Sequence, residues 1–368
     1  MSLLADLDPG TSTSPAPDEF TARFAAALDD FFRTRPPVDA ARELVDELHA
    51  LVLAGGKRIR PAFAWWGWRA AGGEVRGDAA EATVRALVAL ELLQCCALVH
   101  DDVMDRSETR RGRPAAHEAF AAQHRRRRWA GSARRHGDSA AILVGDLALA
   151  WADDALVTAG LSPAALQRAW RPWQAMRTEM MAGQHLDLRA TAGRDGSLEG
   201  ALRVAALKTA AYTVERPLHL GAALADAPPD VIACLRAFGQ DVGVAFQLRD
   251  DLIGVFGDSE VTGKPVGGDL REGKRTPLMA LAVAHATAAG DHAAVRTLSR
   301  CLGGAPVTEE LVSAARALLV DLGAVEAVEG HIDALTASGL AALDRADVDE
   351  VARARLRRLA VRAVRRHG

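Results

Sequence analysis

The sequence reads Leu98-Val99-His100-Asp101-Asp102-Val103-Met104-Asp105 at the end of a long apolar run, and this stretch decides the expected fold. The run, residues 84–99, contains neither glycine nor proline, as is typical of a buried helix. Residues four apart share one face of a helix. Asp101 and Asp105 should therefore project side by side, roughly 6 Å apart along the axis, with Asp102 about 100° round from Asp101.

Three carboxylates at the end of an apolar helix repel one another, and burial disfavours their charged forms. A hard divalent cation removes this conflict, because Mg²⁺ takes oxygen ligands from one or two carboxylates and completes its shell with water and phosphate oxygens. Arg110 and Arg111 follow a few residues later, and each can grip a phosphate through two hydrogen bonds. The stretch therefore predicts a site for Mg²⁺ and a diphosphate.

A plainer interpretation of the same residues is a solvated helix end with an acidic cap. It leaves unexplained the apolar residues that lead into the aspartates, the Arg110-Arg111 pair, and a second acidic pair at Asp250-Asp251. We therefore favour the metal and diphosphate site.

The composition predicts one large all-α domain. Of 368 residues, 49% are hydrophobic and only 5% aromatic. Alanine and leucine dominate, and the helical spacing of apolar residues recurs from end to end, which indicates an extensive helical core. The net charge of −3 gives no overall attraction to nucleic acid or to an anionic membrane. We therefore expect small-molecule partners and no nucleic acid.

The cysteines and the N-terminus predict a cytoplasmic protein without stable membrane insertion. None of the four cysteines has metal-binding spacing, and free thiols fit a reducing compartment. Residues 1–17 lack the basic-then-apolar pattern of a signal peptide, and no uninterrupted apolar run reaches the length of about 18 residues that suits a membrane span. Residues 1–17 are rich in Pro, Ser, Thr and Asp and are predicted to be a disordered tail, with residues 18–368 forming the single domain.

Apolar periodicity predicts helices along the rest of the chain. We expect helices at residues 19–34, 38–54, a Trp-rich segment ending at Gly72-Gly73, 78–105, 139–159, 163–190, 198–225 (interrupted at Pro217) and 228–256, and four or five more over 275–367. Residues 125–138 are rich in arginine and lack apolar periodicity, so we predict a solvated loop there. A glycine-rich loop is expected over residues 257–273.

A second acidic helix end is predicted at Asp250-Asp251, where the sequence reads Phe-Gln-Leu-Arg-Asp-Asp-Leu-Ile-Gly over residues 246–254. The following glycine-rich loop carries Lys264 and Lys274. Two acidic helix ends, each followed by basic residues, could face each other across one cavity and hold several Mg²⁺ ions against a single diphosphate. An ordinary flexible connection is the alternative interpretation of the loop.

Other candidates are weaker when taken alone. Lys57 and Arg60 follow two glycines, so cations and backbone could approach an anion closely there. Lys208 lies in an alanine-rich helix, where an unpaired lysine would be costly, and this favours an anionic partner. Gln184 lies one helical turn before Asp187, and we interpret it as satisfied core polarity.

Several motifs, in order, resemble those of the trans-isoprenyl diphosphate synthases of the polyprenyl synthetase family, most closely the bacterial geranylgeranyl diphosphate synthases. The resemblance covers about residues 50–280. It is carried by GGKRIRP (55–61), LVHDDVMDRSETRRGRP (98–114), GQ..D (183–187), KT (208–209), FQLRDD (246–251) and GKP (263–265). It implies an isoprenoid-synthase fold, in which helices surround a deep central cavity, usually in a homodimer.

The resemblance also implies roles for the acidic residues. Asp101 and Asp105 would bind Mg²⁺ with an allylic diphosphate, with Asp102 in support, and Asp250 and Asp251 would bind a further ion from the facing wall. About three Mg²⁺ ions per site are implied when substrate is bound. Together with Lys208, the residues Asp101, Asp105 and Asp250 would carry the catalysis.

Two sets of residues are implied to bind two diphosphates. The allylic diphosphate would contact Arg110, Lys208, Thr209, Gln247, Lys264 and Lys274. Isopentenyl diphosphate would contact Lys57, Arg60, Gln94 and Arg111. The implied reaction is a 1'-4 head-to-tail prenyl transfer that makes a longer all-trans prenyl diphosphate.

The sequence departs from the family pattern at two positions. Gln94 stands where many relatives have histidine, and Gly254 stands where the second acidic motif has its last carboxylate. Just upstream of Asp101, where the growing chain is expected to descend, Cys96 and Ala97 are small. Aromatic residues there block elongation early in short-product relatives, so geranylgeranyl diphosphate is the expected product.

Two other function classes stay open at this point. A terpene cyclase of the same fold would ionise a prenyl diphosphate without condensation, and the altered second motif favours it. It would have no use for Lys57, Arg60 and Arg111. The other class is non-enzymatic: a non-catalytic partner subunit, or a helical binding module that uses residues 125–128.

Overall fold

The computed structural model describes residues 19–35, 38–257, 266–303 and 306–365 of the chain. The described residues form helices, apart from one antiparallel ribbon of two short strands. The predicted all-α class is therefore confirmed. The division into a tail over residues 1–17 and a single domain stays a prediction, because the tail lies outside the described residues.

The first half of the chain supplies one wall of the molecule. Its elements are α1 (Glu19–Arg33), the 3₁₀ turn η1 (Asp39–Ala41), α2 (Arg42–Leu53), α3 (Ile59–Ala70), α4 (Asp78–Ala86), α5 (Val88–Asp105), β1 (Thr109–Arg110), β2 (Arg113–Pro114), α6 (Ala116–Arg127), α7 (Ala133–Val157) and α8 (Pro163–Gly193).

The second half supplies the facing wall and the C-terminal helices. Its elements are α9 (Leu198–Val204), the π-helical segment η2 (Ala205–Glu215), α10 (Arg216–Leu224), α11 (Pro229–Phe256), α13 (Gly268–Glu272), α14 (Pro277–Ala288), α15 (His292–Cys301), α16 (Glu309–Asp321), α17 (Ala324–Asp344) and α18 (Glu350–Val364).

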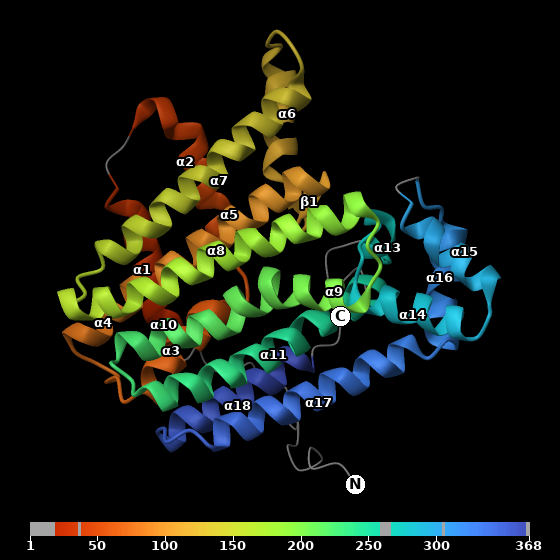
Figure 1. Ribbon diagram of the computed structural model, residues 1–368. Coiled ribbons are helices and arrows are strands. Elements are labelled where there is room, and N and C mark those ends of the chain that lie inside the picture. Colours follow the sequence, from red (N-terminus) through yellow and green to blue (C-terminus); the bar gives the residue numbers. More distant parts are fainter. Residues whose placement is uncertain (1–18, 36–37, 258–265, 304–305, 366–368) are drawn as a thin grey trace.

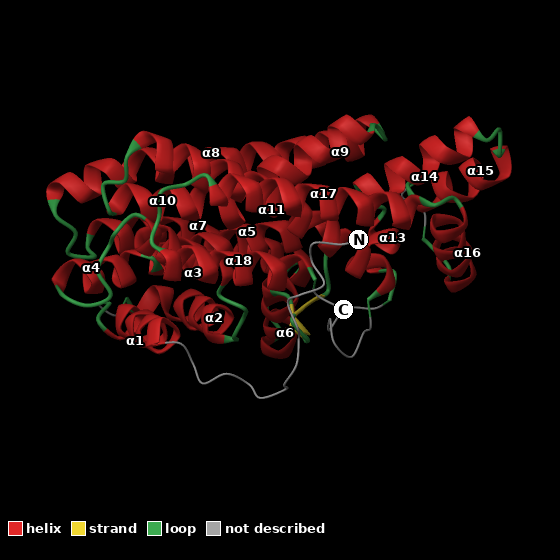
Figure 2. Cartoon of the chain, turned by 90° about the horizontal axis from the view of Figure 1, so that it is seen from below, coloured by secondary structure: helices red, strands yellow, loops and turns green. Residues whose placement is uncertain are grey.

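The helices lie in stacked layers, with α8 and α9 along one face and α1 and α2 along the opposite face (Figure 2). Helix α5 packs along α7, and α11 packs against η2 on one side and α17 on the other. Helix α8 also packs against η2, so α5, α8, η2 and α11 are brought together although they are far apart in sequence (Figure 1). These are the elements that carry the site.

A glycine allows α8 and η2 to approach closely. A Cβ atom built at Gly183 would lie 2.3 Å from the backbone nitrogen of Lys208, a distance that no side chain tolerates. The absence of a side chain at this position lets the two helices touch backbone to backbone. As a result, Gln184 and Asp187 of α8 lie beside Lys208.

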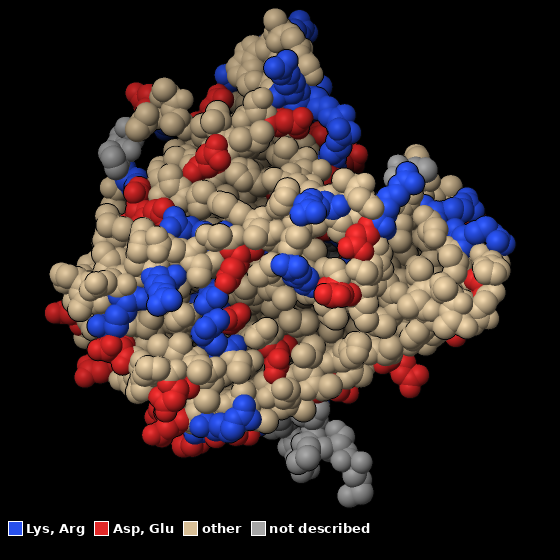
Figure 3. Space-filling view, in the orientation of Figure 1, with Lys and Arg blue, Asp and Glu red and all other residues tan. Residues whose placement is uncertain are grey.

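The prediction of a loop over residues 125–138 is correct only for residues 128–132 and wrong for the rest of this stretch. Helix α6 continues to Arg127 and α7 begins at Ala133. Arginine is a good helix former, and cations in the last turn of a helix interact favourably with its dipole. The rings of His124, Trp129 and His136 also pack on one another at this end. The arginines remain exposed, as expected, and basic side chains gather at the projecting end of α6 (Figure 3).

Three other boundaries differ from the predictions. The helix expected over 78–105 has a one-residue break at Leu87, between α4 and α5. The helix expected over 198–225 with an interruption at Pro217 comprises α9, η2 and α10, which follow one another without a gap; Pro217 lies in the first turn of α10, directly after the π-helical segment, and cannot donate the backbone hydrogen bond expected there. The loop expected over 257–273 contains the short helix α13.

Two helical stretches, Asp78–Asp105 (α4 and α5 together) and Pro229–Phe256 (α11), are long and apolar enough to cross a membrane by length and composition alone. Their most apolar windows are 78% and 50% buried against the rest of the protein. Core helices pass the same test because their apolar side chains pack against other helices. The absence of stable membrane insertion stays a prediction.

Candidate active site

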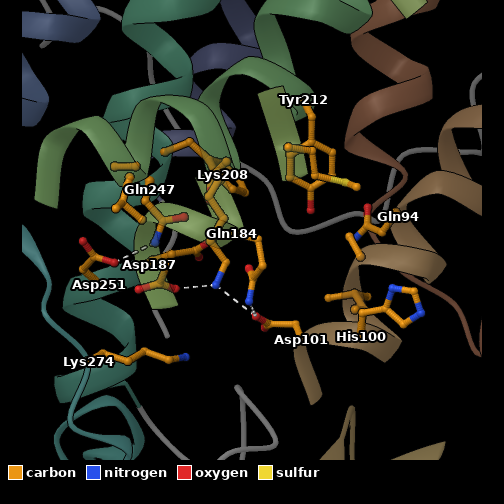
Figure 4. A pocket seen from close by; sticks show the side chains of 18 of the residues that line it. Gln94, His100, Asp101, Gln184, Asp187, Lys208, Tyr212, Gln247, Asp251 and Lys274 are labelled. Carbon is orange, nitrogen blue, oxygen red and sulfur yellow. Dashed lines mark hydrogen bonds and ion pairs between the residues drawn. The ribbon is translucent and has the colours of Figure 1, made fainter. Parts of the chain in front are cut away.

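A cavity of about 670 Å³ lies between α5, α8, η2 and α11. It receives side chains from the segment just before α3 and from the segment that follows α13 as well. Its wall combines carboxylates, cations and apolar groups, and Figure 4 shows how the polar residues converge.

The cavity brings together most of the predicted site residues. Its lining includes Lys57, Arg60, Gln94, Cys96, Ala97, Asp101, Arg111, Lys208, Thr209, Gln247, Asp250, Asp251 and Lys274. Asp102, Asp105 and Arg110 do not belong to this lining. Lys264 lies outside the described residues. Carboxylates at the ends of α5 and α11, about 150 residues apart in the sequence, therefore share one hollow.

Asp101 is the centre of a charged cluster on the α5 side. Its Oδ1 accepts hydrogen bonds from Lys208 Nζ at 2.9 Å and Gln184 Nε2 at 3.0 Å, and Lys208 Nζ also lies 2.6 Å from Asp187 Oδ2 (Figure 4). Burial by itself would raise the pKa of Asp101, but Lys208, Lys274 and Arg110 outweigh it and lower the pKa below its ordinary value. Asp101 and Asp187 in turn raise the pKa of Lys208 to about 12 against the effect of burial.

Asp102 and Arg110 form a pair behind this cluster. Arg110 Nε donates to both carboxylate oxygens of Asp102, at 3.0 and 3.1 Å, and its Nη2 lies 3.8 Å from Asp101 Oδ2. Asp102 is 3% exposed. In this arrangement Arg110 holds the end of α5 to the β1–β2 ribbon, and its predicted contact with a diphosphate stays a prediction.

The α11 side presents a buried carboxylate. Asp251 Oδ1 accepts a hydrogen bond from Gln247 Nε2 at 2.7 Å, while its buried Oδ2 has no hydrogen-bond partner among the described residues. Burial and the neighbouring carboxylate of Asp269 raise the pKa of Asp251 well above its ordinary value. The amino end of Lys274 points toward Asp101 and Asp187 across the cavity (Figure 4).

A second group of cations lines the cavity near the start of α3. Arg60 is almost buried, donates to the side chain of Gln94 and donates to Thr213 Oγ1 at 2.8 Å. Its guanidinium lies 4.0 Å from the centre of the Tyr212 ring. Arg111 donates to the carbonyl oxygen of Gly55, where the paired glycines leave the backbone accessible. Gln94 therefore orients Arg60.

Part of the lining is apolar, with Met180, Met181, Leu188, Val204 and Phe246 beside Cys96 and Ala97. Burial raises the pKa of the Cys96 thiol to about 12, so it stays neutral at physiological pH and behaves as a small hydrophobic group.

Comparison with known proteins decides the family. Residues 41–318 match the family model described as polyprenyl synthetase. The chain belongs to the polyprenyl synthetase family. As a polyprenyl synthetase it is a trans-isoprenyl diphosphate synthase, a transferase of prenyl groups, which confirms the family and the enzyme class expected from the motifs.

Similar polyprenyl synthetases carry different product names. A geranylfarnesyl diphosphate synthase of Aeropyrum pernix is 33% identical over 287 residues, covering 76% of this chain and 80% of that protein. A (2E,6E)-farnesyl diphosphate synthase of Mycobacterium tuberculosis is 37% identical over 240 residues, covering 64% of this chain and 59% of that protein. Family membership therefore leaves the product length of this chain open.

A solved polyprenyl synthetase structure confirms the fold. The geranylgeranyl pyrophosphate synthase of Corynebacterium glutamicum, solved with isoprenyl diphosphate and magnesium, is 42% identical to this chain. The two align with a TM-score of 0.89 over 96% of this chain and 100% of that chain. The predicted isoprenoid-synthase fold is thus confirmed.

Several residues of this polyprenyl synthetase cavity were given no role by sequence reasoning, among them Gln184, Asp187 and Tyr212. Gln184, interpreted as core polarity, contacts Asp101, and Asp187 holds Lys208. Their one-turn spacing on α8 was the available signal. Tyr212 gave no separate signal in the sequence, because its role under Arg60 depends on how η2 packs against α3.

The polar residues of the cavity fit Mg²⁺. Asp101, Asp187, Asp250 and Asp251 offer oxygen donors only, the kind that Mg²⁺ prefers, and the unpaired Oδ2 of Asp251 lacks the partner that a buried carboxylate requires. No three side chains of the metal-binding kinds converge on one point within the described ranges. An ion here would therefore take one or two ligands from the chain and the others from water and diphosphate.

Replacing Asp105 by asparagine is expected to change how the stability of the metal-free protein depends on pH. Burial, with repulsion from Asp101, raises the pKa of Asp105 to about 6. The folded protein then binds this proton more tightly than the unfolded chain, whose aspartate titrates near ~4, so wild-type stability falls as pH rises from about 4 to about 6 and then levels. After allowance for solvent screening, this loss is about 1–2 kcal/mol.

Denaturant unfolding in the presence of a chelator checks this expectation. The free energy of unfolding of Asp105→Asn minus that of wild type should grow by ~1–2 kcal/mol between pH 4.5 and pH 7. A constant difference across this range would show that Asp105 ionises normally.

Proposed function

We propose that this polyprenyl synthetase condenses isopentenyl diphosphate with an allylic diphosphate, in the presence of Mg²⁺, to make geranylgeranyl diphosphate. The observation that carries the proposal is that one cavity has carboxylates on two walls, two groups of cations and an apolar lining. One diphosphate would lie between Asp101 and Asp250 beside Lys208 and Lys274, and the other against Lys57, Arg60 and Arg111.

The reaction begins with breakage of the carbon–oxygen bond of the allylic diphosphate, and the bonding electron pair leaves with the diphosphate. Lys208 and Lys274 stabilise the charge that develops on this leaving group. Mg²⁺, when bound by the carboxylates, supplies a Lewis acid for the same oxygens. Positive charge remains on the allylic carbon.

The new carbon–carbon bond forms from the double-bond electrons of isopentenyl diphosphate, which attack the allylic cation. Arg60 and Arg111 hold the isopentenyl diphosphate so that its double bond is close and oriented. This attack leaves positive charge on the other carbon of the former double bond. A proton then leaves the adjacent carbon, its bonding electrons form the new double bond, and the released diphosphate accepts the proton. The apolar lining excludes water, which would otherwise quench the cation.

A terpene cyclase is the competing function, because Gly254 alters the second acidic motif. The cation group of Lys57, Arg60 and Arg111 favours the synthase, since a cyclase handles only one diphosphate. Incubation with Mg²⁺ and farnesyl diphosphate, with and without isopentenyl diphosphate, separates the two. A synthase consumes isopentenyl diphosphate and gives a longer prenyl diphosphate, whereas a cyclase gives a hydrocarbon or an alcohol in both cases.

Replacing Cys96 by phenylalanine is expected to shorten the main product by at least one isoprene unit. The larger ring would occupy the cavity wall one turn before Asp101, where the growing chain must pass. Chromatography of the dephosphorylated products measures the change. Cys96→Ser, which keeps the side chain small, serves as the matched control and should retain the wild-type product. An unchanged product for both Cys96→Phe and Ala97→Phe would place the limit on chain length elsewhere.

The homodimer, the cytoplasmic location, the absence of a nucleic-acid partner and the number of about three Mg²⁺ ions remain predictions.

A further inference from the structure

The space left by Gly254 is occupied by another carboxylate. Asp250 and Gly254 are four residues apart on α11, so a side chain at 254 would share the face of Asp250. A Cβ atom built at Gly254 would lie 2.0 Å from Asp269 Oδ2. The carboxylate of Asp269, from the short helix α13, therefore lies where the last aspartate of the second acidic motif would begin.

Asp269 is held in this position by the cavity's own residues. Its side chain is only 13% exposed, and Lys274 Nζ lies 3.5 Å from its Oδ1. The side chains of Asp251 and Lys274 both line the cavity, so Asp269 adjoins the second acidic wall.

Asp251 provides an independent sign that a cation belongs here. It is 3% exposed, and its Oδ2 is buried without a hydrogen-bond partner among the described residues. A buried carboxylate oxygen without a hydrogen-bond partner is unfavourable in its charged form unless a cation lies nearby. Lys274 alone leaves this oxygen unpaired.

We propose that Asp269 supplies, from α13, the carboxylate that the second acidic motif lacks at position 254, and so helps to retain Mg²⁺ at Asp250 and Asp251. This inference rests on the proposed function. Because no three carboxylates converge closely among the described residues, Asp269 acts as a positioning residue through water bound to the ion, and Mg²⁺ keeps several waters in such sites. It also explains why position 254 is glycine: a side chain there would push Asp269 away.

Three variants test the proposal by moving or removing this carboxylate. Asp269→Asn removes the charge and keeps the shape. Gly254→Ala adds one methyl group, which displaces the carboxylate of Asp269 without changing any charge. The double variant Gly254→Asp/Asp269→Ala moves the carboxylate to the position that the family pattern gives it. Glu272→Gln is the matched control, because Glu272 lies on the same helix and contacts Lys274 at 2.8 Å, away from Gly254.

The measured quantity is the Mg²⁺ concentration that gives half-maximal binding of inorganic pyrophosphate to the full-length protein. Calorimetry and the shift in unfolding temperature both report this binding. Loss of a residue that orients a metal site typically lowers metal affinity by about 10–100-fold. Asp269→Asn and Gly254→Ala are expected to raise the half-saturating Mg²⁺ concentration by about tenfold or more. Glu272→Gln should stay within about threefold of wild type, and the double variant should recover most of the loss.

The outcomes separate this inference from the proposed function. If wild type binds pyrophosphate with Mg²⁺ but Asp269→Asn needs no more Mg²⁺ than wild type, Asp269 is only a structural partner of Lys274 and the inference is wrong. If Asp269→Asn fails to fold, the double variant Gly254→Asp/Asp269→Ala decides between a role in Mg²⁺ binding and a structural role. Its Mg²⁺ affinity recovers only if the site needs the carboxylate itself. Absence of any Mg²⁺-dependent pyrophosphate binding or prenyl transfer by wild type would instead overturn the proposed function.

Discussion

Replacing Asp101 by asparagine is expected to lower the rate of prenyl transfer by about 10³-fold, which corresponds to ~4 kcal/mol of lost transition-state stabilisation. Asp101 lines the cavity and lies within hydrogen-bond distance of both Lys208 and Gln184. The asparagine keeps the shape but loses the charge that would bind Mg²⁺ and balance Lys208. Because Lys208 keeps its ion pair with Asp187, the loss should appear more in kcat than in protein stability.

Steady-state incorporation of labelled isopentenyl diphosphate measures this effect. Asp347→Asn is the matched control, because Asp347 is exposed and belongs to neither acidic motif, and it should retain wild-type turnover. Asp101→Asn turnover within about tenfold of wild type would mean that the chemistry does not use this carboxylate.

Replacing Lys208 by glutamine is expected to lower kcat by about 10²–10³-fold. Lys208 Nζ lies 2.9 Å from Asp101 Oδ1 and 2.6 Å from Asp187 Oδ2, so it neutralises two carboxylates when no substrate is bound. During the reaction the same cation would stabilise the charge on the leaving diphosphate. Its removal leaves Asp101 and Asp187 facing each other without a cation and also deprives the leaving group of a positive charge.

Lys208→Arg separates these two effects. Arginine keeps the positive charge but not the compact ammonium, so it should restore the stability of the metal-free protein and only part of kcat. Thermal unfolding and kcat should be measured on both variants. If Lys208→Gln lowers stability while leaving kcat unchanged, Lys208 is a structural cation and takes no part in the transfer.

Local patterns were sufficient to predict α5 and its acidic end. The helix is long and mostly apolar, and the spacing of Asp101 and Asp105 follows from helix geometry alone. The same reasoning identified Asp250 and Asp251 at the end of α11. That both ends could share one cavity was a hypothesis from their matching patterns, which the family resemblance then supported, since nothing local fixes how two distant helices pack.

The residues that sequence reasoning missed depend on such packing. Gln184 and Asp187 are cavity residues because Gly183 lets α8 approach η2 closely. The occupation of the Gly254 space by Asp269 depends on the contact of α13 with α11. In the arginine-rich stretch, residues 125–138, the charge pattern correctly indicated that the side chains are exposed. Helix propensity and the packing of the His124, Trp129 and His136 rings explain why most of its backbone is helical.

The most direct test of the two-walled site is prenyl transfer by the double variant Asp101→Asn/Asp250→Asn, assayed with Mg²⁺, labelled isopentenyl diphosphate and farnesyl diphosphate beside wild type. Wild type should give a labelled, longer prenyl diphosphate that disappears when Mg²⁺ is chelated, and the double variant should give none. Full turnover by the double variant would contradict the account, because the metal and the leaving diphosphate would then be held without either wall.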